Sequence, residues 1–71
     1  MKTYIHIYKI RTEKKISLRQ LAYKSGVGKT TINNIENGTK SPTLDTLCRI
    51  AQALDVDVKM LFDCCNDHIH E

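Results

Sequence analysis

The chain has 71 residues, of which 41% are hydrophobic and 27% are charged. This length leaves room for one small domain, and the composition is that of an ordinary globular protein rather than a disordered or fibrous one. No apolar run approaches the roughly 20 residues that cross a bilayer, and no signal peptide is visible at the start of the chain. We therefore expect one small domain without a membrane span, and we do not expect an enzyme.

The cysteines Cys48, Cys64 and Cys65 are an odd number, and two of them are adjacent. A framework of structural disulfides uses an even number of cysteines at wider spacing. We therefore interpret all three as free thiols in a reducing cytoplasm. We expect Cys48 to be buried as a small hydrophobic residue.

The charges are distributed unevenly along the chain. Residues 1–40 contain nine Lys and Arg against two Glu, a net charge of +7, whereas residues 41–71 carry a net charge of −4. A basic half joined to an acidic half indicates one surface for a polyanion and another surface that faces away from it.

Turn-forming residues separate segments of about 8 to 12 residues, a spacing that is typical of short helices in an all-α domain. The first segment is ambiguous, because residues 3–8 alternate polar with apolar side chains, as in a strand. However, Tyr4, Ile7 and Ile10 also lie on one helical face. We predict a helix over residues 3–14, with an extended start up to residue 5 as the alternative.

The next two helices have clear signals at their ends. Ser17 followed three residues later by Gln20 is a capping box, which predicts that a helix begins at residue 18. Gly26 can adopt the left-handed conformation that ends this helix. A third helix is predicted from Lys29 to about residue 37, with Gly38 as its stop.

Two further helices are predicted in the acidic half. Pro42 and Thr43 open the fourth helix, where Thr43 can act as the cap. Its expected apolar stripe consists of Leu44, Leu47, Cys48, Ala51 and Leu54. Asp57 can cap a final helix, whose expected apolar residues are Val58, Leu61 and Phe62.

Residues 24–30, KSGVGKT, look like a phosphate-binding loop. Such a loop needs a buried apolar strand before it and a helix after it. The preceding segment is instead a capped amphipathic helix, and 71 residues cannot build the parallel sheet of a nucleotide-binding domain. We therefore reject a nucleotide-binding function.

The same residues fit a helix–turn–helix. Ala22 is a small residue where two helices would cross, Gly26 permits the turn, and Val27 can fill the inside of the corner. Leu21, Ile32 and Ile35 are expected to close the core that the two helices share. Each position meets a separate steric requirement, which favours this interpretation over a chance match.

These residues make the chain similar to the Cro and phage-repressor (XRE-type) helix–turn–helix family over about residues 5–62. The motifs that carry the resemblance are Leu21-Ala22, Gly26-Val27, Thr31-Ile32, Ile35-Glu36-Asn37-Gly38, Pro42-Thr43-Leu44, Leu47, Ala51, Ala53-Leu54 and Val56. The resemblance implies an all-α fold, a compact five-helix, λ-repressor-like DNA-binding domain. We place this domain at residues 1–62 and a short acidic tail at residues 63–71. The resemblance also implies a structural ion pair between Arg11 and Glu36.

In this family the third helix would lie in the major groove, with its first residues on the base edges. Lys29 can donate to guanine, Asn34 can pair with adenine, and Thr30 offers a hydroxyl or a methyl group. The expected base-reading residues are Lys29, Thr30, Asn33 and Asn34, although Lys29 could instead contact only a phosphate. The expected phosphate contacts are Ser17, Arg19, Asn37, Thr39 and Lys40.

A homodimer on double-stranded DNA is expected, since one such module touches few bases. We predict its interface on the final helix and the tail, because Met60, Leu61 and Phe62 exceed what a small core needs. The alternative is that Leu61 and Phe62 only cap the core.

The tail contains four potential metal ligands, Cys64, Cys65, His68 and His70. Zinc or copper sensing is one interpretation, but adjacent cysteines chelate a single tetrahedral ion poorly. We therefore predict no metal site and no cofactor.

The function that we predict is that of a sequence-specific transcriptional regulator, most simply a repressor. An antitoxin is an alternative, in which a toxin protein would be a further partner, and a co-regulator is another possible protein partner. A protein-interaction module that has lost DNA binding is a third interpretation. The basic first half and the polar outer face of the third helix argue against it.

Overall fold

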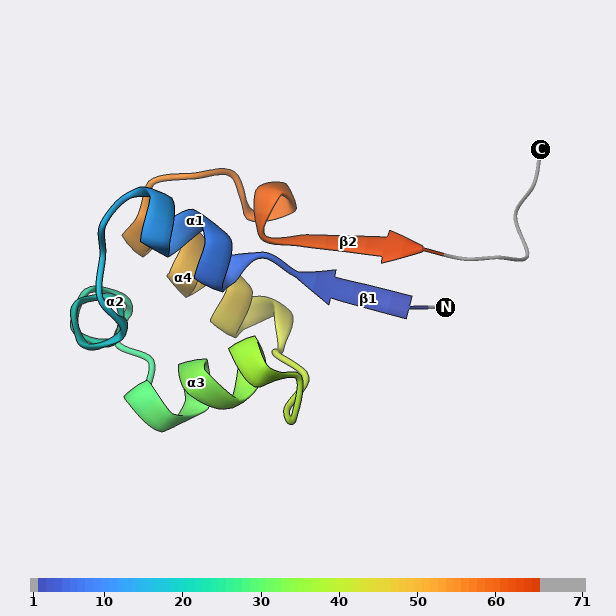
Figure 1. The fold of residues 1–71 in the computed structure, drawn as a ribbon, viewed down its shortest axis with the longest axis horizontal. Helices are drawn as coiled ribbons and strands as arrows, with labels where there is room; N and C mark the ends of the chain where they lie inside the picture. Colours follow the sequence, from blue (N-terminus) through green and yellow to red (C-terminus); the bar gives the residue numbers. More distant parts are fainter. Residues whose placement is uncertain (1, 66–71) are drawn as a thin grey trace.

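The computed structural model describes residues 2–65. In chain order the elements are β1 (Lys2–Ile5), α1 (Ile7–Glu13), α2 (Leu18–Ser25), α3 (Lys29–Asn37), α4 (Leu44–Leu54), the 3-10 helix η1 (Val58–Leu61) and β2 (Phe62–Cys65). The helices form one body, from which the two strands project as a ribbon (Figure 1). No helix among these residues has the length and hydropathy needed to cross a membrane.

The start of the chain corrects our prediction of a helix over residues 3–14. Lys2–Ile5 form a strand, and α1 begins only at Ile7, with His6 at its N-cap. β1 pairs antiparallel with β2, so that Ile5 lies opposite Phe62. The alternating residues take the extended conformation because a strand at the other end of the chain pairs with them.

The described part of the chain contains four α-helices, and the predicted fifth helix is the single turn η1. Asp57 caps this turn, because its side chain accepts a hydrogen bond of 3.0 Å from the backbone N–H of Lys59. The chain then enters β2, which runs through Cys65. The domain boundary that we predicted after residue 62 therefore lies inside a strand.

Every helix contributes to one core. Its fully buried large side chains are Ile7, Leu21, Ile32, Ile35, Ile50, Leu54 and Leu61. Leu61 therefore belongs to the core and does not form part of an exposed surface. Phe62 is half-buried, and only Met60 of the three residues predicted for a dimer surface is largely exposed.

The buried stripe of α4 differs from the predicted one. Leu47, Ala51 and Leu54 are buried as expected, but Ile50 completes the stripe, and both Leu44 and Cys48 are exposed. At about 100° per residue, Ile50 lies beside Leu54 on the helix, whereas Cys48 lies on the opposite flank of the stripe. The core therefore contacts α4 along a line rotated away from Cys48.

The predicted helix ends of α2, α3 and α4 are confirmed. Ser17 and Gln20 form the capping box, with hydrogen bonds of 2.8 and 3.0 Å between each side chain and the other residue's backbone N–H. Gly26 and Gly38 both have the left-handed conformation, and Thr43 caps α4.

Candidate nucleic-acid interface

The corner between α2 and α3 is built by residues 25–28. Gly26 has a φ of +74°, and its N–H donates to Ala22 O, which ends α2. The hydroxyl of buried Ser25 accepts a hydrogen bond of 3.2 Å from the N–H of Val27, which packs half-buried against the core. A helix therefore leads into Gly26, where a phosphate-binding loop would require a strand.

α3 has one buried side and one exposed side. Ile32 and Ile35 are buried, whereas Lys29, Thr30, Asn33 and Asn37 are exposed. At about 100° per residue these four exposed residues occupy a continuous arc of about 100° on the helix. Asn34 is half-buried and lies at the edge of this arc. The structure thus brings the four predicted base-reading residues and Asn37 together on one side of α3.

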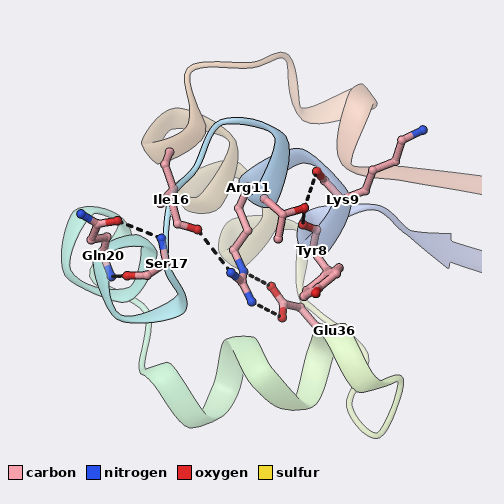
Figure 2. A network of polar contacts seen from close by, with 8 residues as sticks. Tyr8, Lys9, Arg11, Ile16, Ser17, Gln20 and Glu36 are labelled. Carbon is pink, nitrogen blue, oxygen red and sulfur yellow. Dashed lines mark hydrogen bonds and ion pairs between the residues drawn. The ribbon is translucent and has the colours of Figure 1, made fainter.

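The other end of α3 is fastened to α1 by an ion pair. Arg11 donates hydrogen bonds of 2.7 and 3.1 Å to the two carboxylate oxygens of Glu36 (Figure 2). The side chains of Arg11 and Glu36 are only 11% and 6% exposed. The hydrogen bond to Glu36 and the negative charge of its carboxylate raise the pKa of Arg11 above its ordinary value, so Arg11 stays protonated.

Two further contacts hold Arg11 in place, and neither was apparent in the sequence. Its Nη1 donates a hydrogen bond of 3.2 Å to the carbonyl oxygen of Ile16, just before α2. Its guanidinium lies over the ring of Tyr8, 5.0 Å from the ring centroid. Arg11, on α1, thereby contacts both α3 and the loop between α1 and α2. These contacts fix the orientation of α3 relative to the other helices.

The turn after α3 folds back on the carbonyl oxygen of Asn34. This oxygen accepts hydrogen bonds from the N–H and the hydroxyl of Thr39 and from the N–H of Lys40, at 3.0, 3.1 and 3.3 Å. The Thr39 hydroxyl therefore donates its hydrogen bond within the turn. The side chain of Lys40 is exposed.

The remaining predicted phosphate contacts lie at the start of α2. The Ser17 hydroxyl accepts a hydrogen bond from the N–H of Gln20, which leaves its own proton available to a ligand. Arg19 is exposed on the first turn of the helix. Of the five predicted phosphate contacts, Thr39 is thus the one whose hydroxyl already donates a hydrogen bond within the protein.

Residues 2–65 contain no group of three or more His, Cys, Asp or Glu side chains that could hold a metal ion. Cys64 is an exposed free thiol on β2. The side chain of Cys65, together with His68 and His70, lies outside the described residues, so the metal-sensing interpretation of the tail is not tested.

A family model described as "Helix-turn-helix" matches residues 7–61. The match covers most of the chain and begins where α1 begins. The chain therefore belongs to the Cro and phage-repressor (XRE-type) helix–turn–helix family, which consists of DNA-binding regulators rather than enzymes.

Among curated proteins, the HTH-type transcriptional regulator Rv0474 of Mycobacterium tuberculosis is 40% identical over 47 residues, which are 66% of this chain. The chain spans 34% of that regulator's length.

Two solved structures have the same fold. The restriction-modification controller protein C.AhdI of Aeromonas hydrophila has a TM-score of 0.74 at 28% identity, over 76% of this chain and 82% of its own. The N-terminal DNA-binding domain of SinR of Bacillus subtilis has a TM-score of 0.73 at 36% identity, over 78% of this chain and 81% of its own.

Proposed function

We propose that this chain is a sequence-specific transcriptional regulator, most simply a repressor, that reads DNA with α3 in the major groove. The observation that carries the proposal is the polar arc on α3, which is exposed while Ile32 and Ile35 are buried. An α-helix fits the major groove, where each base pair presents a distinct pattern of donors and acceptors. The arc offers an ammonium, hydroxyl and amide groups to that pattern.

Lys29, Thr30 and Asn33 are the strongest candidates for base contacts, because all three are exposed in the first half of α3. In this docking mode the first residues of the recognition helix contact the base edges. Asn34 can contribute an amide from the edge of the arc. Lys29 can donate to guanine O6 and N7, and an Asn can pair with adenine N6 and N7.

The flanking contacts are assigned to phosphates. Arg19, Asn37 and Lys40 have exposed side chains, and Ser17 keeps a hydroxyl proton that it can donate. For Thr39 we propose that the hydroxyl shapes the turn, because it donates its hydrogen bond to Asn34 O. Such contacts set the register of α3 on the duplex without reading its sequence.

One copy of α3 can contact only a few base pairs. We propose that the chain binds as a homodimer to two half-sites separated by one helical turn of DNA, about 34 Å. The net charge of +3 supports attraction of the protein to the polyanion.

Selection of bound fragments from a pool of random duplexes tests this function. We expect enrichment of one short motif in two inverted copies, with binding that weakens as the salt concentration rises. Salt-dependent binding without an enriched motif would contradict sequence-specific recognition. Absence of any duplex binding would contradict a DNA-binding function altogether.

A further inference from the structure

The ribbon formed by β1 and β2 lies outside the unit that defines the family. The family model covers residues 7–61, and both strands flank this range. An isolated two-stranded ribbon is only marginally stable in water, and it gains stability when one face is covered. We propose that a second copy of this chain covers one face of the ribbon, and that this contact forms the dimer that the proposed function requires.

The two faces of the ribbon differ in polarity. In an antiparallel pair, directly opposite residues share a face, so Thr3 and Ile5 lie with Cys64 and Phe62 on one side. This side, the uncharged face, contains no ionisable group other than the thiol of Cys64. The other side contains Asp63, whose carboxylate lies 2.8 Å from Nε2 of His6. The carboxylate on this second face therefore already has a polar partner, His6, within the chain.

The uncharged face continues into a groove on the helical body. The groove has a volume of about 320 Å³, and the apolar side chains of Ile35, Pro42 and Leu47 contribute to its lining along with the uncharged face. The exposed Lys40 is the only charged residue among those that line it. A partner that covers this surface must itself be largely uncharged there, and the same face of a second copy meets that requirement.

The position of α3 selects between face-to-face and edge-to-edge pairing. In Figure 1, β2 lies above β1, and α3 lies below β1 on the same side of the molecule as the free edge of that strand. Joining two copies along either free edge would place their α3 helices on opposite sides of the dimer. Such a dimer could not present both helices to one duplex.

Face-to-face packing of the two ribbons allows both α3 helices to face one duplex. A two-fold axis that runs across the strands, in the direction from β2 to β1, keeps the β1 edges of both copies on the same side. Both α3 helices then lie on the same side of the dimer. Because this step uses the requirement for two α3 helices on one duplex, the inference rests on the proposed function.

The size of the surface predicts how tightly the two copies bind. Each strand has four residues, and four residues of a strand span only about 13 Å. The contact therefore belongs among small, weak interfaces. We expect a dissociation constant between about 10 μM and about 1 mM in solution, with tighter assembly when both copies occupy one duplex.

Sedimentation equilibrium of the 71-residue chain tests the interface without DNA. We expect the wild-type chain to form dimers as its concentration rises from about 10 μM to about 1 mM. Thr3→Lys and Cys64→Lys each place a charge on the uncharged face, from different strands, and each should raise the dissociation constant at least about tenfold. A wild-type chain that stays monomeric up to about 1 mM would overturn the proposal.

Tyr4→Lys is the matched control, since it adds the same charge to β1 at the neighbouring position on the opposite face. We expect its dissociation constant to stay within about threefold of the wild-type value. An equal effect of Tyr4→Lys and Thr3→Lys would show that the uncharged face is not the interface. Melting temperatures at low protein concentration verify that each variant folds, and Cys64→Lys provides the test if Thr3→Lys does not fold.

Measurements of DNA binding distinguish a failure of the proposed interface from a failure of the proposed function. On a selected duplex with both half-sites, Thr3→Lys should bind more weakly than Tyr4→Lys, whereas the two variants should bind a single half-site equally. A wild-type dimer that Thr3→Lys dissociates, but that binds no duplex, would contradict the proposed function and still support the interface.

Discussion

Arg11 and Glu36 join α1 to the last turn of α3 through two hydrogen bonds, although the residues are 25 positions apart in the chain. The pair is almost fully enclosed, with Arg11 11% and Glu36 6% exposed. Each charge is therefore compensated mainly by the other. The pair holds the end of α3 opposite to the corner at Gly26, so both ends of the helix are fixed.

Replacing one member of this pair should destabilise the fold. We expect Glu36→Gln, and separately Arg11→Met, to lower the free energy of unfolding by about 1–3 kcal/mol, because each leaves an enclosed group without its partner. Urea unfolding measures both values. In the double variant the loss should be clearly smaller than the sum of the two single losses. Additive losses would show that the two side chains do not interact.

Gly26 and Gly28 lie two residues apart in the corner, and we expect alanine to destabilise the fold only at Gly26. Gly26 has a φ of +74°, whereas Gly28 has a φ of −59°. A Cβ at Gly26 would meet only Arg49 Nη1 at 3.8 Å, so the cost of Gly26→Ala is conformational and should be about 1 kcal/mol. Gly28→Ala should change the free energy of unfolding by less than about 0.5 kcal/mol, because the smaller entropy of the unfolded chain is offset by the loss of a favoured residue at the N-cap of α3. Equal urea midpoints for the two variants would contradict the left-handed corner.

Lys15 is a site where stability can be gained. Its φ of 60° lies in the left-handed region just after α1, which a residue with a Cβ adopts at a cost. Lys15→Gly should therefore raise the free energy of unfolding by about 0.5–1 kcal/mol. Lys14→Gly, one position earlier at a φ of −88°, should lower it. Thermal unfolding of the two variants checks this difference, and destabilisation by Lys15→Gly would contradict it.

Cys48 and Ala51 test the orientation of α4. Cys48 is exposed, whereas Ala51 is only 4% exposed. Cys48→Ser should change the free energy of unfolding by less than about 0.5 kcal/mol. Ala51→Ser should cost about 1 kcal/mol or more, since it places a hydroxyl against the core. If Cys48→Ser proves the more destabilising change, α4 is rotated relative to the structure.

Local signals predicted the helices that form the corner. The capping box at Ser17 and the left-handed Gly26 and Gly38 depend on residues close in the chain, so the sequence shows them directly. The strand β1 could not be assigned in this way, because its partner β2 lies at the other end of the chain. The choice between two conformations of residues 3–5 was decided by a long-range pairing.

In the candidate nucleic-acid interface, too, the features set by the spacing of neighbouring residues were predictable and those that depend on the folded backbone were not. The spacing of Ile32 and Ile35 predicts which side of α3 is buried, and therefore which residues form the polar arc. The stack of Tyr8 on Arg11 and the bond from Arg11 to Ile16 O depend on how α1 crosses the other helices. The use of the Thr39 hydroxyl within its own turn likewise required the folded backbone.

The most direct test of base reading by α3 compares the binding of Asn33→Ala and Lys40→Ala to a selected duplex and to random DNA. If α3 reads bases, Asn33→Ala should weaken binding to the selected duplex by about 1–3 kcal/mol and leave binding to random DNA almost unchanged. Lys40→Ala should weaken both equally and reduce the slope of log affinity against log salt concentration by about one. Equal losses on both duplexes for Asn33→Ala would contradict base reading by the exposed side of α3.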